Sequence, residues 1–200
     1  MKTIVITKKT SAFGTSGVVL CLCLLQASVA ALSAADTTYK SDNRGQFSVS
    51  DYKFAKEAAL GGQMEVELGR IASQKAVSPS VQQFGQRMVT DHSKAGDKLK
   101  EIASKNGAML PSELSTTEQH EVNKLNKLSG QEFDKEYVSL MVKDHKKDLK
   151  EFQHTAKTAD NAELRQFAQM TSVTIQEHLT TIENIERQLS TSRPTASVRQ

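Results

Sequence analysis

Histidine directly follows an acidic residue at three places in this sequence, and two of these places share a longer motif. Met-Val-x-Asp-His is present at residues 88–92 and again at residues 141–145, and a third acid-histidine pair is Glu177-His178. Imidazole nitrogens and carboxylate oxygens are common ligands of transition metals and common partners in buried hydrogen bonds. The sequence therefore predicts a layer of histidine and carboxylate side chains as its main chemical feature.

Apolar residues recur around these histidines at intervals of three and four, which indicates that each histidine faces the interior of a helical bundle. In ferritin-like di-iron proteins, carboxylates and imidazoles from facing helices converge in this way. Ligands of these types suit a divalent ion such as zinc, copper or iron. The candidate metal ligands, drawn from four helices, are Glu65, Glu67, Asp91, His92, Asp144, His145, Glu177 and His178.

The spacing of acid and histidine departs from the di-iron pattern, in which Glu-x-x-His places both side chains on one helix face. Neighbouring residues on a helix point ~100° apart, so Asp91 and His92 cannot both point at the bundle axis. The sequence has a Glu-x-x-His at Glu151 and His154, but the second and fourth long helices have no counterpart. This disfavours an iron oxidase. Two interpretations stay open: a mononuclear metal site, or a polar layer that only fixes the helix register.

Signatures of catalysis do not accompany the histidines. The sequence has no nucleophile-base motif, no glycine-rich phosphate loop and no zinc-binding cysteine cluster. We therefore expect no catalytic residues and no organic cofactor. The two functional hypotheses are a binding protein of the cell envelope that holds a metal ion, and a non-catalytic structural or interaction module.

Four long amphipathic segments must position the candidate ligands. Ser50 is predicted to cap a helix over residues 51–76, and further long helices are expected over 79–105, 130–158 and 161–189. A short helix opened by a capping box at Ser115 is expected between the second and third of these, and another capping box at Ser129. Tight, long and tight connections predict two antiparallel hairpins joined by a crossover, which is an all-α, ferritin-like four-helix bundle.

A pair of glycines, Gly61-Gly62, lies inside the first predicted helix. Each glycine costs roughly 1 kcal/mol relative to alanine in a helix interior. The pair therefore indicates either the close approach of a neighbouring helix or a bend.

The N-terminal segment has the pattern of a secretory signal. Three lysines precede an apolar run at residues 18–29, and small residues suited to cleavage follow. Both cysteines lie in this segment, so we expect no disulfide in the rest of the chain. Without the three lysines, the 26 basic residues fall to 23 and match the 23 acidic ones, which excludes nucleic acid as an expected partner.

These patterns predict an exported protein of the periplasm or outer membrane, with peripheral association with the cell envelope as a further hypothesis. The expected layout is a signal peptide (1–35), a flexible leader (36–49), the helical bundle (50–189) and a flexible tail (190–200).

Several segments together resemble one bacterial family, the ferritin-like proteins catalogued as domain of unknown function 4142 and described as predicted outer membrane proteins. The resemblance implies an exported four-helix bundle and no established activity. The matching segments are Ala58–Gly69, Met88–Ala95, Leu128–Asp134, Met141–His145 and Glu177–Leu179.

Overall fold

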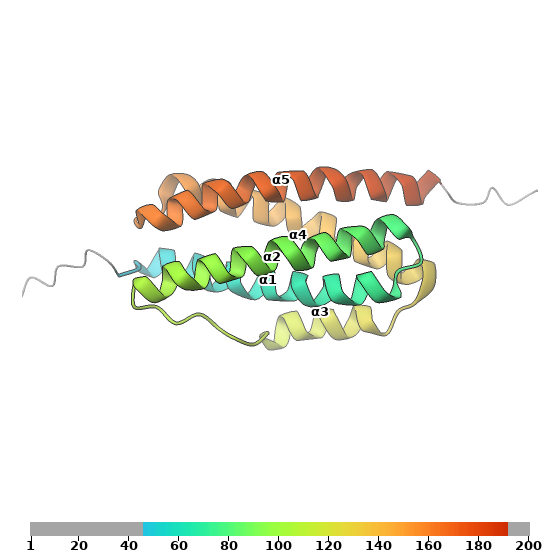
Figure 1. Cartoon of the computed structure of the whole chain (residues 1–200), viewed down its shortest axis with the longest axis horizontal. Helices are drawn as coiled ribbons and strands as arrows, with labels where there is room; N and C mark the ends of the chain where they lie inside the picture. Colours follow the sequence, from blue (N-terminus) through green and yellow to red (C-terminus); the bar gives the residue numbers. More distant parts are fainter. Residues whose placement is uncertain (1–45, 192–200) are drawn as a thin grey trace, which may run out of the picture. The chain divides into compact units, whose positions relative to one another are not determined.

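The computed structural model describes residues 46–191, and their regular structure is entirely helical (Figure 1). The predicted signal segment, most of the leader and the end of the tail lie outside these residues. Within the described range there is no strand, so the predicted all-α class is confirmed. The helices are α1 (Val49–Lys75), α2 (Pro79–Lys105), α3 (Thr116–Asn126), α4 (Gly130–Thr158) and α5 (Ala162–Thr191).

The four long helices form two hairpins, α1 with α2 and α4 with α5, that pack against each other as a four-helix bundle. Short turns join the helices within each hairpin, whereas residues 106–129 cross from one hairpin to the other. Figure 1 shows α3, which belongs to this crossover, beside α1. The predicted ferritin-like arrangement of tight, long and tight connections is thus present. No helix in residues 46–191 has the length and apolar character needed to cross a membrane.

The helix ends follow the sequence signals with two exceptions. Pro79 begins α2, and the Ser115 hydroxyl caps α3 by accepting a hydrogen bond from the Thr117 N–H at 3.2 Å. The first helix, however, is capped by Ser48 rather than by Ser50, because the Ser48 hydroxyl accepts the N–H of Asp51 at 3.1 Å. Ser129 is the N-cap residue of α4, as expected, but its side chain makes no capping hydrogen bond, so the predicted capping box does not form.

Two buried carboxylates join the hairpins at opposite ends. Asp134 of α4 accepts the N–H groups of Val77 and Ser78, at 3.1 and 2.8 Å, in the turn between α1 and α2. Asp51 of α1 accepts the N–H groups at positions 160 and 161, at 3.1 and 2.8 Å, in the turn between α4 and α5. The carboxylates at positions 51 and 134 lie 83 residues apart, and so do the paired turn positions 77 and 160, and 78 and 161. Each position in the first hairpin therefore corresponds to the position 83 residues later in the second.

Replacing Asp134 with alanine is expected to lower the free energy of unfolding by about 3 kcal/mol, because two backbone N–H groups lose their acceptor in a part-buried turn. Urea denaturation followed by circular dichroism measures this change. The exposed Asp97 is a matched control, and its alanine variant should stay within about 0.5 kcal/mol of the wild type. Equal effects of the two substitutions would contradict the assigned role.

The helices α1 and α2 approach each other closely at Gly69 and Gly85. A Cβ atom built on Gly69 would lie 2.6 Å from the carbonyl oxygen of Gly85, and one on Gly85 would lie 2.7 Å from that of Gly69. The expectation that Gly61-Gly62 marks such an approach is wrong for Gly61, since a Cβ there meets no atom within 4 Å. The residue of α1 that lets the two helices touch, Gly69, is therefore about two turns further along the helix.

Candidate metal centre

A polar layer lies between two apolar clusters of the bundle core. On α2, Met88 belongs to one cluster and Leu99 to the other, and His92 lies between them. Each of the four long helices contributes one buried member of this layer: Glu65 from α1, His92 from α2, His145 from α4 and His178 from α5, with 2%, 9%, 0% and 1% of their surfaces exposed. The apolar stripes of the helices hold these four polar side chains inside the bundle.

The three imidazoles surround one point. Their ring centres lie 5.4 Å apart for His92 and His178, 5.4 Å for His145 and His178, and 5.7 Å for His92 and His145. One nitrogen atom from each ring lies within 4.8 Å of the other two. A metal ion about 2.1 Å from three imidazole nitrogens places the ring centres about 5 Å apart, which is close to the separations observed here.

Each imidazole has one nitrogen beside an acceptor. Nδ1 of His145 lies 2.9 Å from the carbonyl oxygen of Met141, Nε2 of His178 lies 2.8 Å from Oδ2 of Asp91, and Nδ1 of His92 lies 2.9 Å from Oε2 of Glu65. In a neutral imidazole the nitrogen facing an acceptor carries the proton, and the other nitrogen then offers a lone pair. Metal-binding histidines use this arrangement to fix the ring and its tautomer.

The second nitrogen of each ring is buried and has no hydrogen-bond partner. These atoms are Nε2 of His92, Nε2 of His145 and Nδ1 of His178. A buried polar atom without a partner is rare and costs about 1–3 kcal/mol. Three such lone pairs, drawn from three helices into one layer, have the chemistry of an incomplete ligand set.

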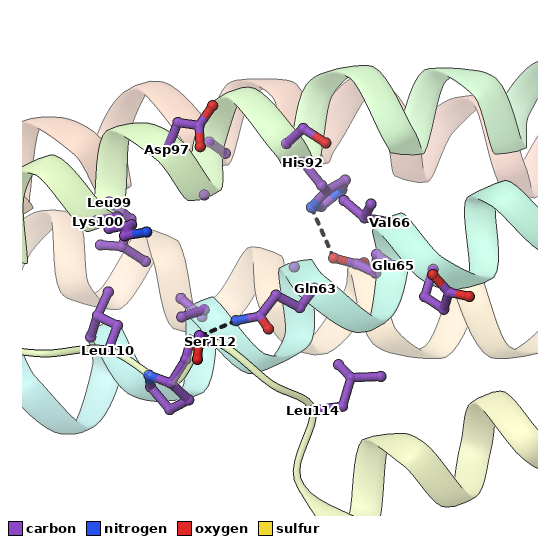
Figure 2. A pocket seen from close by; sticks show the side chains of 18 of the residues that line it. Gln63, Glu65, Val66, His92, Asp97, Leu99, Lys100, Leu110, Ser112 and Leu114 are labelled. Atoms are coloured by element: carbon purple, nitrogen blue, oxygen red, sulfur yellow. Dashed lines mark hydrogen bonds and ion pairs between the residues drawn. The ribbon is translucent and has the colours of Figure 1, made fainter. Parts of the chain in front are cut away.

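Glu65 is the carboxylate of this layer. Its Oε2 approaches Nδ1 of His92 at 2.9 Å, which Figure 2 marks, and its Oε1 approaches Nδ1 of His145 at 3.4 Å. Both contacts have ion-pair distances, but their directions are poor for hydrogen bonds, and neither oxygen has a hydrogen-bond partner. Because Glu65 contacts the Nδ1 atoms, it leaves the Nε2 atoms on the opposite sides of the two rings available.

The three histidines of the layer differ in the direction in which their pKa values are shifted. Burial lowers the pKa of His178 to about 4 and also lowers the pKa of His145. Burial opposes protonation of His92 too, but the close contact with Glu65 and the charges of Asp148 and Asp91 together outweigh burial and raise the pKa of His92. Although burial alone would raise the pKa of Glu65, the charges of His92 and His145 lower it to about 2. The carboxylate is thus ionised at neutral pH, and its charge favours a cation in the layer.

The other four predicted ligands lie around the layer. Asp91 contacts His178 from outside and also pairs with Arg87, which reaches Glu177 at 2.7 Å. Glu67 pairs with Arg70 at 3.1 Å on the α1 surface. Asp91 therefore contacts the layer through His178, and Glu177 is connected to Asp91 through Arg87. Glu67 takes no part in the layer.

Two carboxyl groups of α4, those of Asp144 and Asp148, lie near Glu65 of α1. Asp148 was not among the ligands predicted from the sequence. Burial, reinforced by the charge of Glu65, raises the pKa of Asp144 to about 6 and that of Asp148 to about 8. Asp148 follows His145 by three residues, a spacing that places both on one helix face. That spacing was a usable signal, because it is the reverse order of the Glu-x-x-His pair considered above.

Comparison with known proteins gives a family and a fold. The family described as "Domain of unknown function (DUF4142)" matches residues 36–185. No curated protein sequence matches the chain.

Two solved structures resemble the fold, a DUF305 fragment from Deinococcus radiodurans and a DUF305 protein from Streptomyces coelicolor. The first has 12% identity and a TM-score of 0.63, covering 72% of this chain and 99% of its own; the second has 13% identity and a TM-score of 0.60, covering 70% and 94%. At such low identity, the likeness establishes the helical fold alone.

Proposed function

The chain belongs to the DUF4142 family, whose function is not established, and we propose that it is an exported protein that binds one divalent transition-metal ion. The ion binds to Nε2 of His92, Nε2 of His145 and Nδ1 of His178, with Glu65 as the balancing charge. The observation that carries this proposal is the set of three buried, unpartnered imidazole nitrogens in one layer. Export is supported by the signal pattern and by the name of the Streptomyces coelicolor neighbour, "putative secreted protein DUF305".

The donor set selects the kind of ion. Three imidazoles and one carboxylate suit zinc, copper or iron(II), whereas calcium and magnesium prefer six or more oxygen ligands. Three protein nitrogens also leave a further coordination position, which water can fill. We place the protein in the periplasm or at the outer membrane, where it holds the ion and associates peripherally with the envelope.

Zinc titration of the chelator-treated protein, purified without a polyhistidine tag, tests the proposal. Isothermal titration calorimetry is expected to give one Zn²⁺ per chain, and magnesium is expected to give no heat of binding. Co²⁺ should produce the visible absorption of an ion with nitrogen ligands. If neither Zn²⁺ nor Cu²⁺ binds above the level of a His92→Ala, His145→Ala, His178→Ala triple variant, the proposal fails.

Metal affinity is expected to fall as the pH is lowered. His145 and His178 have lowered pKa values and are neutral at pH 7, so His92, with its raised pKa, is the histidine from which the ion displaces a proton. Zinc affinity should therefore drop about tenfold per unit of pH below the pKa of His92, and become independent of pH above it. Calorimetric titrations between pH 5.5 and 8.5 measure this slope. A flat profile over that range would contradict the assigned ligand state.

The alternative function is a structural module in which the polar layer only fixes helix register. The observation that favours it is the chain of contacts from His178 through Asp91 to Arg87, which is complete without an ion. In that case replacing all three histidines with leucine should preserve or raise stability, as replacing buried ionic groups with apolar ones often does. Metal titration of the wild type separates the two functions.

A further inference from the structure

A cavity of about 730 Å³ adjoins the polar layer on the side of α1, α2 and the crossover. Figure 2 shows Glu65 and His92 beside it, and Leu110, Ser112 and Leu114 of the crossover along another side. The crossover is held there by a hydrogen bond of 2.9 Å from the Gln63 side-chain amide to the carbonyl oxygen of Pro111. Cavities of this volume are typical of small-molecule sites.

Two glycines keep the cavity open. Gly62 of α1 and Gly96 of α2 both line it; a Cβ on Gly62 would meet only Nδ1 of His92, at 3.9 Å, and a Cβ on Gly96 would meet nothing within 4 Å. Gly69 and Gly85, in contrast, are required where the helices touch. Each mid-helix glycine costs roughly 1 kcal/mol relative to alanine. Neither position needs a glycine for helix contact, but both line the cavity, and a side chain larger than alanine at either position would occupy part of it.

The correspondence between the two hairpins accounts for the location of the cavity. At the spacing of 83 residues that relates Asp51 to Asp134, Glu65 corresponds to Asp148 and Gly62 corresponds to His145. On α1 the carboxylate of Glu65 follows Gly62 by three residues, and on α4 the carboxyl group of Asp148 follows His145 by three residues. The two helices therefore match, except that α1 has a glycine where α4 has an imidazole. The cavity lies where α1 lacks that side chain, and Asp148 lines it.

The inner part of the cavity carries the carboxyl groups of Glu65 and Asp148, and the imidazole of His92 faces Glu65 there. Both oxygens of buried Glu65 are without a hydrogen-bond partner, and Asp148 makes no hydrogen bond or ion pair with residues 46–191. The cationic lining residues are Arg70, which is paired with Glu67, and Lys100, which is exposed. The remaining wall includes the apolar side chains of Leu99, Leu110, Phe152, Phe167 and Ile175.

We propose that this cavity binds a small molecule with a protonated amine and an apolar body. The amine donates hydrogen bonds to the ionised carboxylate of Glu65 and to a carboxyl oxygen of Asp148, and the body packs against the apolar wall. Charge complementarity selects the amine, because an anion would face the negative charge of Glu65, and a neutral donor forms weaker hydrogen bonds with a carboxylate than a protonated amine does. The proposal goes beyond metal binding and holds for the metal-free protein.

Benzylamine, benzyl alcohol and benzoate are the probes, since they share one ring and differ in charge. In NMR titrations of the ¹⁵N-labelled, chelator-treated protein, benzylamine is expected to shift amide signals around the cavity and to bind at least tenfold more tightly than benzyl alcohol. Benzoate is expected to leave these signals unchanged. Benzyl alcohol binding as tightly as benzylamine, or no benzylamine shifts at the cavity, would overturn the proposal whether or not the protein binds metal.

Neighbouring glycines provide a matched pair of variants. Gly62→Leu fills the cavity beside His92 and should weaken benzylamine binding at least tenfold, whereas Gly61→Leu, which does not line the cavity, should change it less than twofold. Asp148→Asn should weaken benzylamine binding about fivefold and leave that of benzyl alcohol unchanged. If Gly62→Leu does not fold, Gly96→Leu fills the cavity from α2 instead. Unchanged benzylamine affinity in a folded cavity-filling variant contradicts the proposal.

Discussion

His145→Ala is expected to weaken zinc binding at least ~100-fold, because removing a ligand should cost at least as much as the 10–100-fold loss typical of its outer hydrogen-bond partners. Among the three histidines, His145 is the one whose surroundings best suit a metal ligand. It is fully buried, its Nδ1 is fixed by the Met141 carbonyl oxygen, and its Nε2 has no partner. Competition with a zinc-sensitive chelating dye measures the affinity of wild type and variant under the same conditions.

His154→Ala is the control for this prediction. His154 lies on the same helix but is exposed, so its replacement should change zinc affinity less than twofold. Because His145→Ala leaves a space in the core, its fold is checked by circular dichroism, and His145→Gln provides a larger polar replacement without an imidazole. A folded His145 variant that binds zinc as tightly as His154→Ala would remove His145 from the site.

Gly85→Ala is expected to lower the free energy of unfolding by about 3 kcal/mol, at the upper end of overpacking effects. The added methyl group would lie 2.7 Å from the carbonyl oxygen of Gly69, 2.9 Å from Cβ of Ala72 and 3.0 Å from the backbone nitrogen of Ser73. Two of these atoms belong to the backbone of α1, so α1 and α2 must move apart to admit it. The urea midpoint should fall in equilibrium unfolding, with an unchanged slope.

The same substitution at Gly61 should have the opposite effect. A Cβ at this position meets no atom within 4 Å, so alanine gains helix propensity without a clash and should raise stability by about 1 kcal/mol. Nothing in the structure explains why position 61 is glycine. A loss of stability in Gly61→Ala comparable to that in Gly85→Ala would show that the close contact does not determine the cost.

The sequence by itself determined the helices and the presence of a polar layer. Apolar residues at intervals of three and four specify an inward face for each helix, and this face is a local property of the chain. Because His92, His145 and His178 lie on such faces, their burial followed from periodicity. The long connection between two tight ones likewise predicted the hairpins and the crossover, since a short turn can only join antiparallel neighbours.

Tertiary structure decided which of the predicted ligands meet. Glu65 and Glu67 were equal candidates in the sequence, but Glu65 points into the layer and Glu67 pairs with Arg70 at the surface. Asp91 was a candidate ligand, yet it holds His178 from outside, because its direction differs by about 100° from that of His92.

The repeated motif also did not reveal which positions of the two hairpins correspond in space. The two copies of Met-Val-x-Asp-His are 53 residues apart, whereas the hairpins correspond at 83, so sequence similarity and spatial equivalence differ. Only the packing of α1 against α2 distinguishes Gly69 and Gly85, which permit contact, from Gly62 and Gly96, which line a cavity. The physical reason is that a residue's direction is set by its own helix, whereas what it meets is set by the positions of the other helices.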